Sequence, residues 1–317
     1  MDWLGAGIDV PLAVTRAIHF AATATTTGTL IFRAVVAEAA SCSATPAAII
    51  VRRQTLRVAW ICFAIAAASG LIWLLLQAAS MSGLSFRESM TSDVLLTVTN
   101  ETQFGHVAEF RLVLAAILSG CLAYDRLPLA RGLALATSLG LVAALAWPGH
   151  AGSTAGDMGI MHLTADALHL IAAAVWIGGL GSLVLLLSVT RRDQTHAGAS
   201  FARDATQSFS RMGVAIVVVV FATGIVNAWI LVGSLPALIV TSYGRLLMLK
   251  IALFAVMLLF AATNRFWLTP RLTFEGEPQL KALRRLARNS MIEIALALLI
   301  FAIVGLLGML NPASHAL

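Results

Sequence analysis

Of the 317 residues, 59% are hydrophobic and 11% are charged, and the mean hydropathy is +0.90. These values lie outside the range of soluble globular chains and exclude that class of protein. The formal net charge is +6. Because the basic residues cluster on one side of the predicted membrane helices, this charge reports topology and gives no support to nucleic-acid binding.

Apolar stretches of about 20 residues, long enough to cross a ~30 Å hydrocarbon layer as helices, recur eight times along the chain. They fall near residues 11–35, 56–79, 105–123, 132–148, 163–188, 212–233, 243–264 and 289–310. The alternation typical of a transmembrane barrel is absent. We therefore expect an all-α polytopic membrane protein with eight transmembrane helices. Asp2 and Asp9 replace the basic start of a signal peptide, so we expect the first helix to be retained.

Most of the 21 Lys and Arg residues flank the odd-numbered connections between these spans. The even-numbered connections and the termini hold only Arg87. The positive-inside rule therefore places both termini in the periplasm. By this topology Cys42, Cys62 and Cys121 lie in the cytoplasmic half, where disulfides are disfavoured, and we expect free thiols.

Three signatures recur in the same order in the two halves of the chain. "RAIHF" places Arg16 three residues before His19, and "DALHL" places Asp166 three residues before His169. Ser69-Gly70 and Thr223-Gly224 each end thirteen residues after an arginine, and T-x-F/Y-G precedes Arg111 and Lys250 at equal distances. The order of the matches predicts two tandem four-helix repeats, residues 1–155 and 156–317, within one integral membrane domain.

The start of the fifth span carries several groups that bind metals. On a helix, His162, Asp166 and His169 fall within about 60° of one another and form one stripe running into the bilayer. Met158 and Met161 add thioethers, which favour Cu(I), whereas imidazole also accepts Cu(II). We expect Asp166 to orient the His169 ring as a second-shell acceptor. The structural alternative is a hydrogen-bonded packing cluster at a helix end.

Further candidate ligands lie at the same predicted outer boundary. We expect a metal ion to be captured there and passed to His169 in a vestibule between the two repeats. The additional histidines are His19, His106 and His150. Polar support for the path would come from Arg16, Arg111, Lys250, Asn227, Tyr243 and Trp176. For the buried cations, pairing with Glu109, Asp166 or backbone carbonyls is an equally good structural interpretation.

Three further expectations concern packing and loops. Gly178, Gly179 and Gly181 form a small-residue face that another helix can approach closely. Residues 264–290 are expected to be a long inside loop containing an interfacial helix, "KALRRLAR". Glu293 would then lie at the start of the last span and favour its N-terminus electrostatically.

Four segments resemble the copper resistance D (CopD) family of bacterial inner-membrane proteins. They are "DALHLIAAAVWIGGL", "FSRMGVAIVVVVFATGIVNAWI", "TSYGRLLMLKIALFAVMLLFAATNRFWLTPRL" and "RNSMIEIALALLIFAIVGLLGMLNP". The resemblance implies an eight-span protein that moves periplasmic copper toward the cytoplasm, beside a separate periplasmic copper-binding protein of the CopC type. The positions that match the family are His169, Trp176, Tyr243, Lys250, Asn264 and Glu293.

Two other functions remain open on the sequence alone. His19 and His169 could ligate a single b-type haem in a membrane electron carrier, or the chain could be a copper-delivery scaffold for oxidase assembly. No nucleotide-binding motif of the P-loop type is present, and no cytoplasmic loop is long enough for an ATPase domain. These absences exclude a pump driven by its own ATP hydrolysis. We also expect the chain not to be an enzyme.

Overall fold

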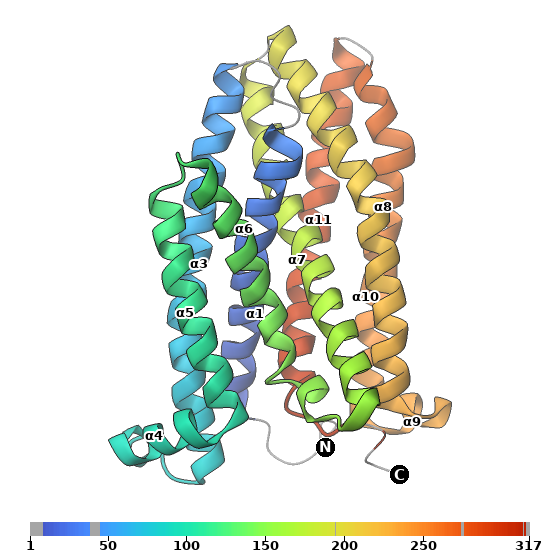
Figure 1. Ribbon diagram of the computed structural model, residues 1–317. Coiled ribbons are helices and arrows are strands. Elements are labelled where there is room, and N and C mark those ends of the chain that lie inside the picture. Colours follow the sequence, from blue (N-terminus) through green and yellow to red (C-terminus); the bar gives the residue numbers. More distant parts are fainter. Residues whose placement is uncertain (1–8, 39–44, 194, 274–275, 313, 315–317) are drawn as a thin grey trace.

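The computed structural model describes residues 9–38, 45–193, 195–273, 276–312 and 314, and within these ranges the regular structure is entirely helical (Figure 1). Eight helices are long and apolar enough to cross a membrane, so the predicted all-α class with eight membrane helices is confirmed. Cys42 and His315 lie outside the described residues.

The eight membrane helices are joined by short segments and two small surface helices. The long helices are α1 (Val10–Ile31), α3 (Pro46–Ser82), α5 (Gln103–Ala123), α6 (Pro128–Ala143), α7 (Gly156–Asp193), α8 (His196–Val232), α10 (Ser242–Thr263) and α11 (Glu277–Leu307). Two π-helical segments continue α1 and α10, namely η1 (Phe32–Ala37) and η5 (Asn264–Leu268). The remaining short elements are η2 (Glu88–Met90), α4 (Ser92–Glu101), η3 (Ala144–Ala146), η4 (His150–Ser153), α9 (Leu235–Val240) and η6 (Thr269–Thr273).

Helices α1 and α7 form the centre of the bundle, and the other long helices surround them (Figure 1). The buried share of the most apolar window is 72% in α1 and 56% in α7, against 17% in each of α5, α8 and α10. The peripheral helices therefore present most of their apolar surface outward, as expected of helices that face lipid.

Small residues allow the two central helices to touch. A Cβ atom on Gly28 would overlap the carbonyl oxygen of Ala174, and one on Gly178 would overlap the backbone of Gly28. Gly179 lies equally close to the Phe209 ring of α8, whereas Gly181 faces open space. The predicted close approach is confirmed for Gly178 and Gly179 and is wrong for Gly181.

The two halves enter their third long helix in the same way. Before α5, the Thr102 hydroxyl accepts a hydrogen bond from the Gly105 amide at 3.0 Å, and before α10 the Thr241 hydroxyl accepts from the Gly244 amide at 3.0 Å. Each glycine lies against the backbone of the preceding short helix, α4 or α9. The T-x-F/Y-G signature is therefore a helix N-cap with a close backbone contact. The tandem repeat itself remains a prediction, which these matched contacts support.

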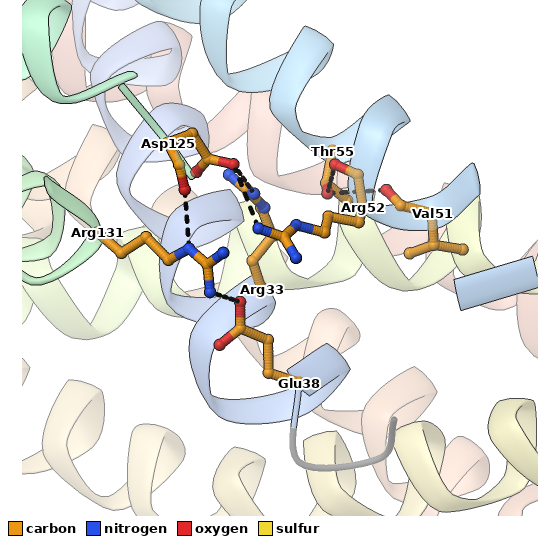
Figure 2. Close-up of polar contacts among 7 residues, drawn as sticks. All are labelled: Arg33, Glu38, Val51, Arg52, Thr55, Asp125 and Arg131. Carbon is orange, nitrogen blue, oxygen red and sulfur yellow. Dashed lines mark hydrogen bonds and ion pairs between the residues drawn. The ribbon is translucent and has the colours of Figure 1, made fainter. Parts of the chain in front are cut away.

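One end of the bundle carries the arginines of the odd-numbered connections, and we call it the basic end. Figure 2 shows Arg33 and Arg52 converging on Asp125 while Arg131 contacts Asp125 and Glu38. The Arg33 guanidinium lies 2.8 Å from the Asp125 carboxylate, with side-chain exposures of 6% and 14%. Arg131 donates to the Asp125 carbonyl at 2.8 Å and to Glu38 at 3.3 Å. The cluster thus joins η1, α3 and α6. Helices α4 and α9 lie at the opposite end, together with the start of α1 (Figure 1).

The region before the last span differs from its sequence-based prediction. Instead of a long loop with a separate interfacial helix, η5 and η6 lead into α11, which begins at Glu277 and includes the basic segment. Glu293 therefore lies in the interior of α11 and is 1% exposed. Its predicted role at a helix N-terminus is wrong, because the helix starts four turns earlier.

Candidate functional site

His19 of α1 is buried, and hydrogen bonds occupy both of its ring nitrogens. Its Nδ1 donates to the Ala66 carbonyl at 2.9 Å and also lies 3.1 Å from the Ser69 hydroxyl, both on α3. Its Nε2 is bonded to the Arg111 guanidinium of α5. A carbonyl only accepts and a guanidinium only donates, so the ring is a neutral Nδ1–H tautomer whose lone pair is taken by Arg111.

His169 of α7 occupies the matching place against α8. Its Nδ1 lies 3.0 Å from the Thr223 hydroxyl, which itself donates to the Val219 carbonyl at 2.6 Å. The Thr223 oxygen must therefore accept from Nδ1–H, and the Val220 carbonyl is a second acceptor for that ring. Nothing among the described residues hydrogen-bonds to Nε2. His169 is thus oriented by its Nδ1 with its Nε2 lone pair left for a ligand.

The two histidines do not converge on one site. His19 contacts α3 and α5, and His169 contacts α8 and lies beside Lys250 of α10. A cavity of about 460 Å³ is lined by His19 and Arg111 but not by His169. The expected vestibule holding both imidazoles is therefore not formed, because the rings point to opposite sides of the central α1–α7 pair. The haem alternative loses its support as well. The two rings face apart, and the Nε2 lone pair of His19 is already bonded to Arg111, so none is left for iron.

Asp166 is not the acceptor that orients His169. Its Oδ1 accepts a hydrogen bond from the Asn227 amide of α8 at 3.0 Å. The Lys250 ammonium is close enough to interact electrostatically with the Asp166 carboxylate and the His169 ring. The Asp166 carboxylate interacts in the same way with the Tyr243 hydroxyl. The prediction that Asp166 is a second-shell partner of His169 is wrong, because Thr223 fills that place. Asp166 instead attracts Lys250 electrostatically near the imidazole, although the two side chains form no ion pair in the described structure.

In the first half, no carboxylate among the described residues forms an ion pair with the two arginines at the corresponding positions, Arg16 and Arg111. The Arg16 guanidinium lies over the Trp73 ring, 5.2 Å from its centroid, and its Nε has no hydrogen-bond partner. Glu109, a predicted partner of these cations, is exposed on α5 and lines the same cavity as His19 and Arg111, but it forms no ion pair with either arginine. The charge of Arg111 beside His19 is therefore not neutralised by a directly paired carboxylate.

His162 lies near the N-terminal end of α7, next to the connection from η4. It is 1% exposed, and its Nδ1 lies 2.8 Å from the Thr154 hydroxyl, which donates to the His150 carbonyl at 3.2 Å. His150 bonds through Nε2 to the Leu307 carbonyl at 3.2 Å, and its ring packs edge-on against Tyr243 with centroids 5.9 Å apart. His150, His162 and Tyr243 are thus brought together between η4, α7 and α10, at the end opposite the basic end.

The remaining candidates are dispersed. Met158 and Met161, on the same turn of α7 as His162 or one turn before it, are 50% and 46% exposed. His106 is bonded to the Asn100 carbonyl at the α4–α5 corner of the first half. Trp176 lies deeper on α7, where it packs against Phe254 and hydrogen-bonds to Glu293. Within the described part of the chain, no group of three or more His, Cys, Asp or Glu side chains is positioned to hold a metal ion. Cys62 and Cys121 are free thiols, as predicted.

The sequence did not assign a role to several residues that shape these sites. Ser69 and Thr223 appeared only as signatures of the repeat, although each contacts the histidine of its own half. Thr154 holds His162 and could not be recognised, because an isolated threonine carries no signal. Asn289 and Ser290, described below, follow the basic segment that was expected to be a separate interfacial helix.

Comparisons with known proteins identify the family. A family model described as "Copper resistance protein D" matches residues 203–307, and one described as "Copper resistance protein D-like, N-terminal domain" matches residues 7–160. "Copper resistance protein D" of Pseudomonas syringae pv. tomato is 30% identical over 77% of this chain and 79% of its own length. "Inner membrane protein YebZ" of Escherichia coli (strain K12) is 31% identical over 67% of this chain and 70% of its own.

A third relative matches a shorter region. "Copper transport protein CutJ" of Bacillus subtilis (strain 168) is 32% identical over 39% of this chain and 22% of its own length. No solved structure matches the chain. The eight apolar helices and these relatives make it a multi-pass inner-membrane protein that handles copper. The chain belongs to the copper resistance protein D family.

Proposed function

We propose that this protein carries copper across the inner membrane toward the cytoplasm, along the face of α7 in its second half. Met158 and Met161 would meet the ion at the exposed end of the helix, and His162 and His169 would receive it in turn. His169 lies about 10 Å further along α7 than His162. The observation that supports this most strongly is the hydrogen bonding of His169, which fixes the proton on Nδ1 and leaves Nε2 for the metal.

The distribution of buried charge favours the second half over an interface between the halves. A cation that approached His19 would meet the Arg111 guanidinium bonded to its Nε2. Of the described residues, Glu109 is the one carboxylate that lines the cavity beside His19, and it is exposed and forms no ion pair with Arg111. Near His169, the Asp166 carboxylate attracts Lys250 and so partly offsets its positive charge. Because electrostatic interactions are strong in a low-dielectric interior, this difference opposes passage of an unshielded cation through the first half.

The ligand chemistry favours Cu(I) as the transported form. Thioethers and imidazoles are soft or intermediate donors, and the exposed methionines at the entrance match Cu(I) better than Cu(II). A separate periplasmic copper-binding protein of the CopC type could load this entrance, where the two methionine side chains are half exposed. We propose no enzymatic step, because the named groups bind and pass an ion without a chemical change to it.

Transport by proteoliposomes tests this proposal. Vesicles containing the full chain are supplied with Cu(I) on one side, and copper inside them is measured over time for wild type, His169→Ala and His19→Ala. We expect His169→Ala to abolish flux and to weaken Cu(I) binding to what Met158, Met161 and His162 provide, whereas His19→Ala keeps the wild-type Cu(I) affinity. Equal flux in protein-containing and empty vesicles contradicts transport, and if Cu(I) binding persists there, a copper-delivery scaffold is indicated.

A further inference from the structure

A second polar site lies in the same half of the bundle but near its basic end. It borders a cavity of about 280 Å³ formed by residues of α7, α8, α10, η5, η6 and α11. Glu293 of α11 lines this cavity and is 1% exposed. It follows Arg288, the last basic residue of α11, by about 7.5 Å along the helix axis. The carboxylate thus lies a short distance inside the apolar part of the helix.

Two donors hold the Glu293 carboxylate in one orientation. The Asn264 amide of η5 donates to Glu293 Oε1 at 2.7 Å, and the Trp176 side chain of α7 is a second hydrogen-bond partner. Asn264 is itself oriented by Asn289, whose amide donates to Asn264 Oδ1 at 2.9 Å. The π-helical geometry of η5 places Asn264 within this chain of hydrogen bonds, as irregular helical turns often do at functional sites.

No cation balances this carboxylate. Among the described residues, Glu293 forms no ion pair. Arg265 of η5 is the other ionisable side chain that lines the cavity, and its guanidinium is bound by the backbone carbonyl and hydroxyl of Ser210. The other cavity-lining residues, from α7, α8, α10, η6 and α11, are uncharged. A buried carboxylate without a counter-ion is costly, so a bound cation or proton must neutralise it for part of the time.

One more polar group that lines the cavity has no hydrogen-bond partner among the described residues. It is the hydroxyl of Ser290, which lies one turn before Glu293 on the same face of α11 and is fully buried. The oxygen donors of Glu293 and Ser290 are hard ligands that do not select copper. A proton on the carboxyl group neutralises Glu293 without any need for a metal ion.

We propose that Glu293 is a proton-binding site, reached from the basic end through this cavity, that takes up and releases one proton as copper moves along α7. The proton comes from cytoplasmic water, binds the carboxylate to give the neutral acid, and returns to water in the reverse step. Coupling to copper rests on the proposed transport function. Proton binding by Glu293 does not, and it can be tested without copper.

Infrared difference spectroscopy of the full chain in liposomes tests proton binding. Spectra recorded as pH is varied, in water and in D₂O, should contain the carbonyl band of a protonated carboxyl group. We expect Glu293→Gln to remove this band, and Glu109→Gln and Asp166→Asn to keep it. Glu293→Asp should retain a titrating band if Glu293→Gln fails to fold.

Three outcomes of the spectra overturn the proposal. If the Glu293-dependent band does not change with pH, or if no such band is seen at any pH, Glu293 only joins η5 to α11 through hydrogen bonds and does not exchange a proton. A band that disappears when sodium replaces choline at constant pH makes the site a sodium site.

A second measurement tests coupling. A pH-sensitive dye inside copper-transporting proteoliposomes should report proton movement with wild type and none with Glu293→Gln, while Cu(I) binding at His169 persists. Proton movement that is unchanged in Glu293→Gln overturns the coupling. If wild type moves no copper, the proposed transport function fails, and the infrared titration still decides whether Glu293 binds a proton.

Discussion

Arg111 donates a hydrogen bond to Nε2 of His19 and so removes the lone pair that this histidine would need to bind a metal. His169, its counterpart in the second half, has no such partner on Nε2 among the described residues. Two histidines at matching places in the sequence thus differ in what they can bind, and the difference comes from a residue on another helix.

Removing this guanidinium should create a second copper ligand. In Arg111→Met, His19 keeps its Nδ1 bonds to α3 and gains a free Nε2, and one buried cation without a paired carboxylate is lost. We expect Arg111→Met to raise Cu(I) binding above that of the His169→Ala background, as detected by competition with a colorimetric Cu(I) chelator. The same increase in Glu109→Gln, which leaves Arg111 in place, would show that the guanidinium is not the cause.

The hydroxyl of Thr223 should set the copper affinity of His169. Thr223→Val removes the acceptor that fixes the Nδ1–H tautomer, and loss of such a second-shell partner weakens metal binding about 10–100-fold. Because the Val220 carbonyl remains as an acceptor, we expect a loss near the lower end of this range, measured by the same chelator competition. Thr223→Ser should bind like wild type.

A matched control exists in the first half. Ser69 contacts His19 at 3.1 Å, as Thr223 contacts His169. Ser69→Ala should leave Cu(I) affinity unchanged, because His19 is not a ligand in this arrangement. An equal loss of affinity in Ser69→Ala and Thr223→Val would argue against a site confined to the second half.

Close packing of α1 against α7 should make Gly178 intolerant of a methyl group. Gly178→Ala would press a Cβ into the Gly28 backbone, and overpacking of this kind costs about 1–3 kcal/mol. Gly181→Ala, three residues further along the same helix, meets open space and should be neutral or stabilising by up to about 1 kcal/mol. The free energy of unfolding, measured for the two purified variants in mixed detergent micelles, should therefore be lower than wild type in Gly178→Ala and equal to or higher than wild type in Gly181→Ala.

The ion pairs at the basic end should differ in their contributions to stability. Asp125→Asn leaves the Arg33 guanidinium, whose side chain is 6% exposed, without its carboxylate, and breaking a buried pair costs about 3–5 kcal/mol. Glu38→Gln affects an outer pair with side-chain exposures of 31% and 44%, which contributes about 0–1 kcal/mol. The midpoint of detergent-induced unfolding should fall clearly in Asp125→Asn and little in Glu38→Gln, and the reverse order would contradict the assignment.

The fold was largely predictable from the sequence, because the length and hydropathy of the spans determine a bundle of membrane helices. The matched spacings also predicted which residues recur, and Thr102 with Gly105 has the same geometry as Thr241 with Gly244. The ends of the helices were not predictable from hydropathy, since α11 continues through a basic segment that would leave the membrane. That error hid Glu293, which had seemed to lie at a helix end.

Site geometry was less predictable for a different reason. Helical periodicity correctly placed His162, Asp166 and His169 on one helix, but it carries no information on what each faces across a helix interface. The contacts of Arg111 with His19 and of Thr223 with His169 depend on the rotation of four helices about their axes. Periodicity within one helix does not reveal these rotations, and so the expected convergence of His19 and His169 was wrong.

The glycine contact between α1 and α7 also bears on how the chain can be divided. Each half buries its first helix against the first helix of the other, so a half produced alone would expose that surface to lipid without a partner of complementary shape. We therefore expect the separate halves to accumulate only when both are made in the same cell, where they can assemble into a non-covalent heterodimer.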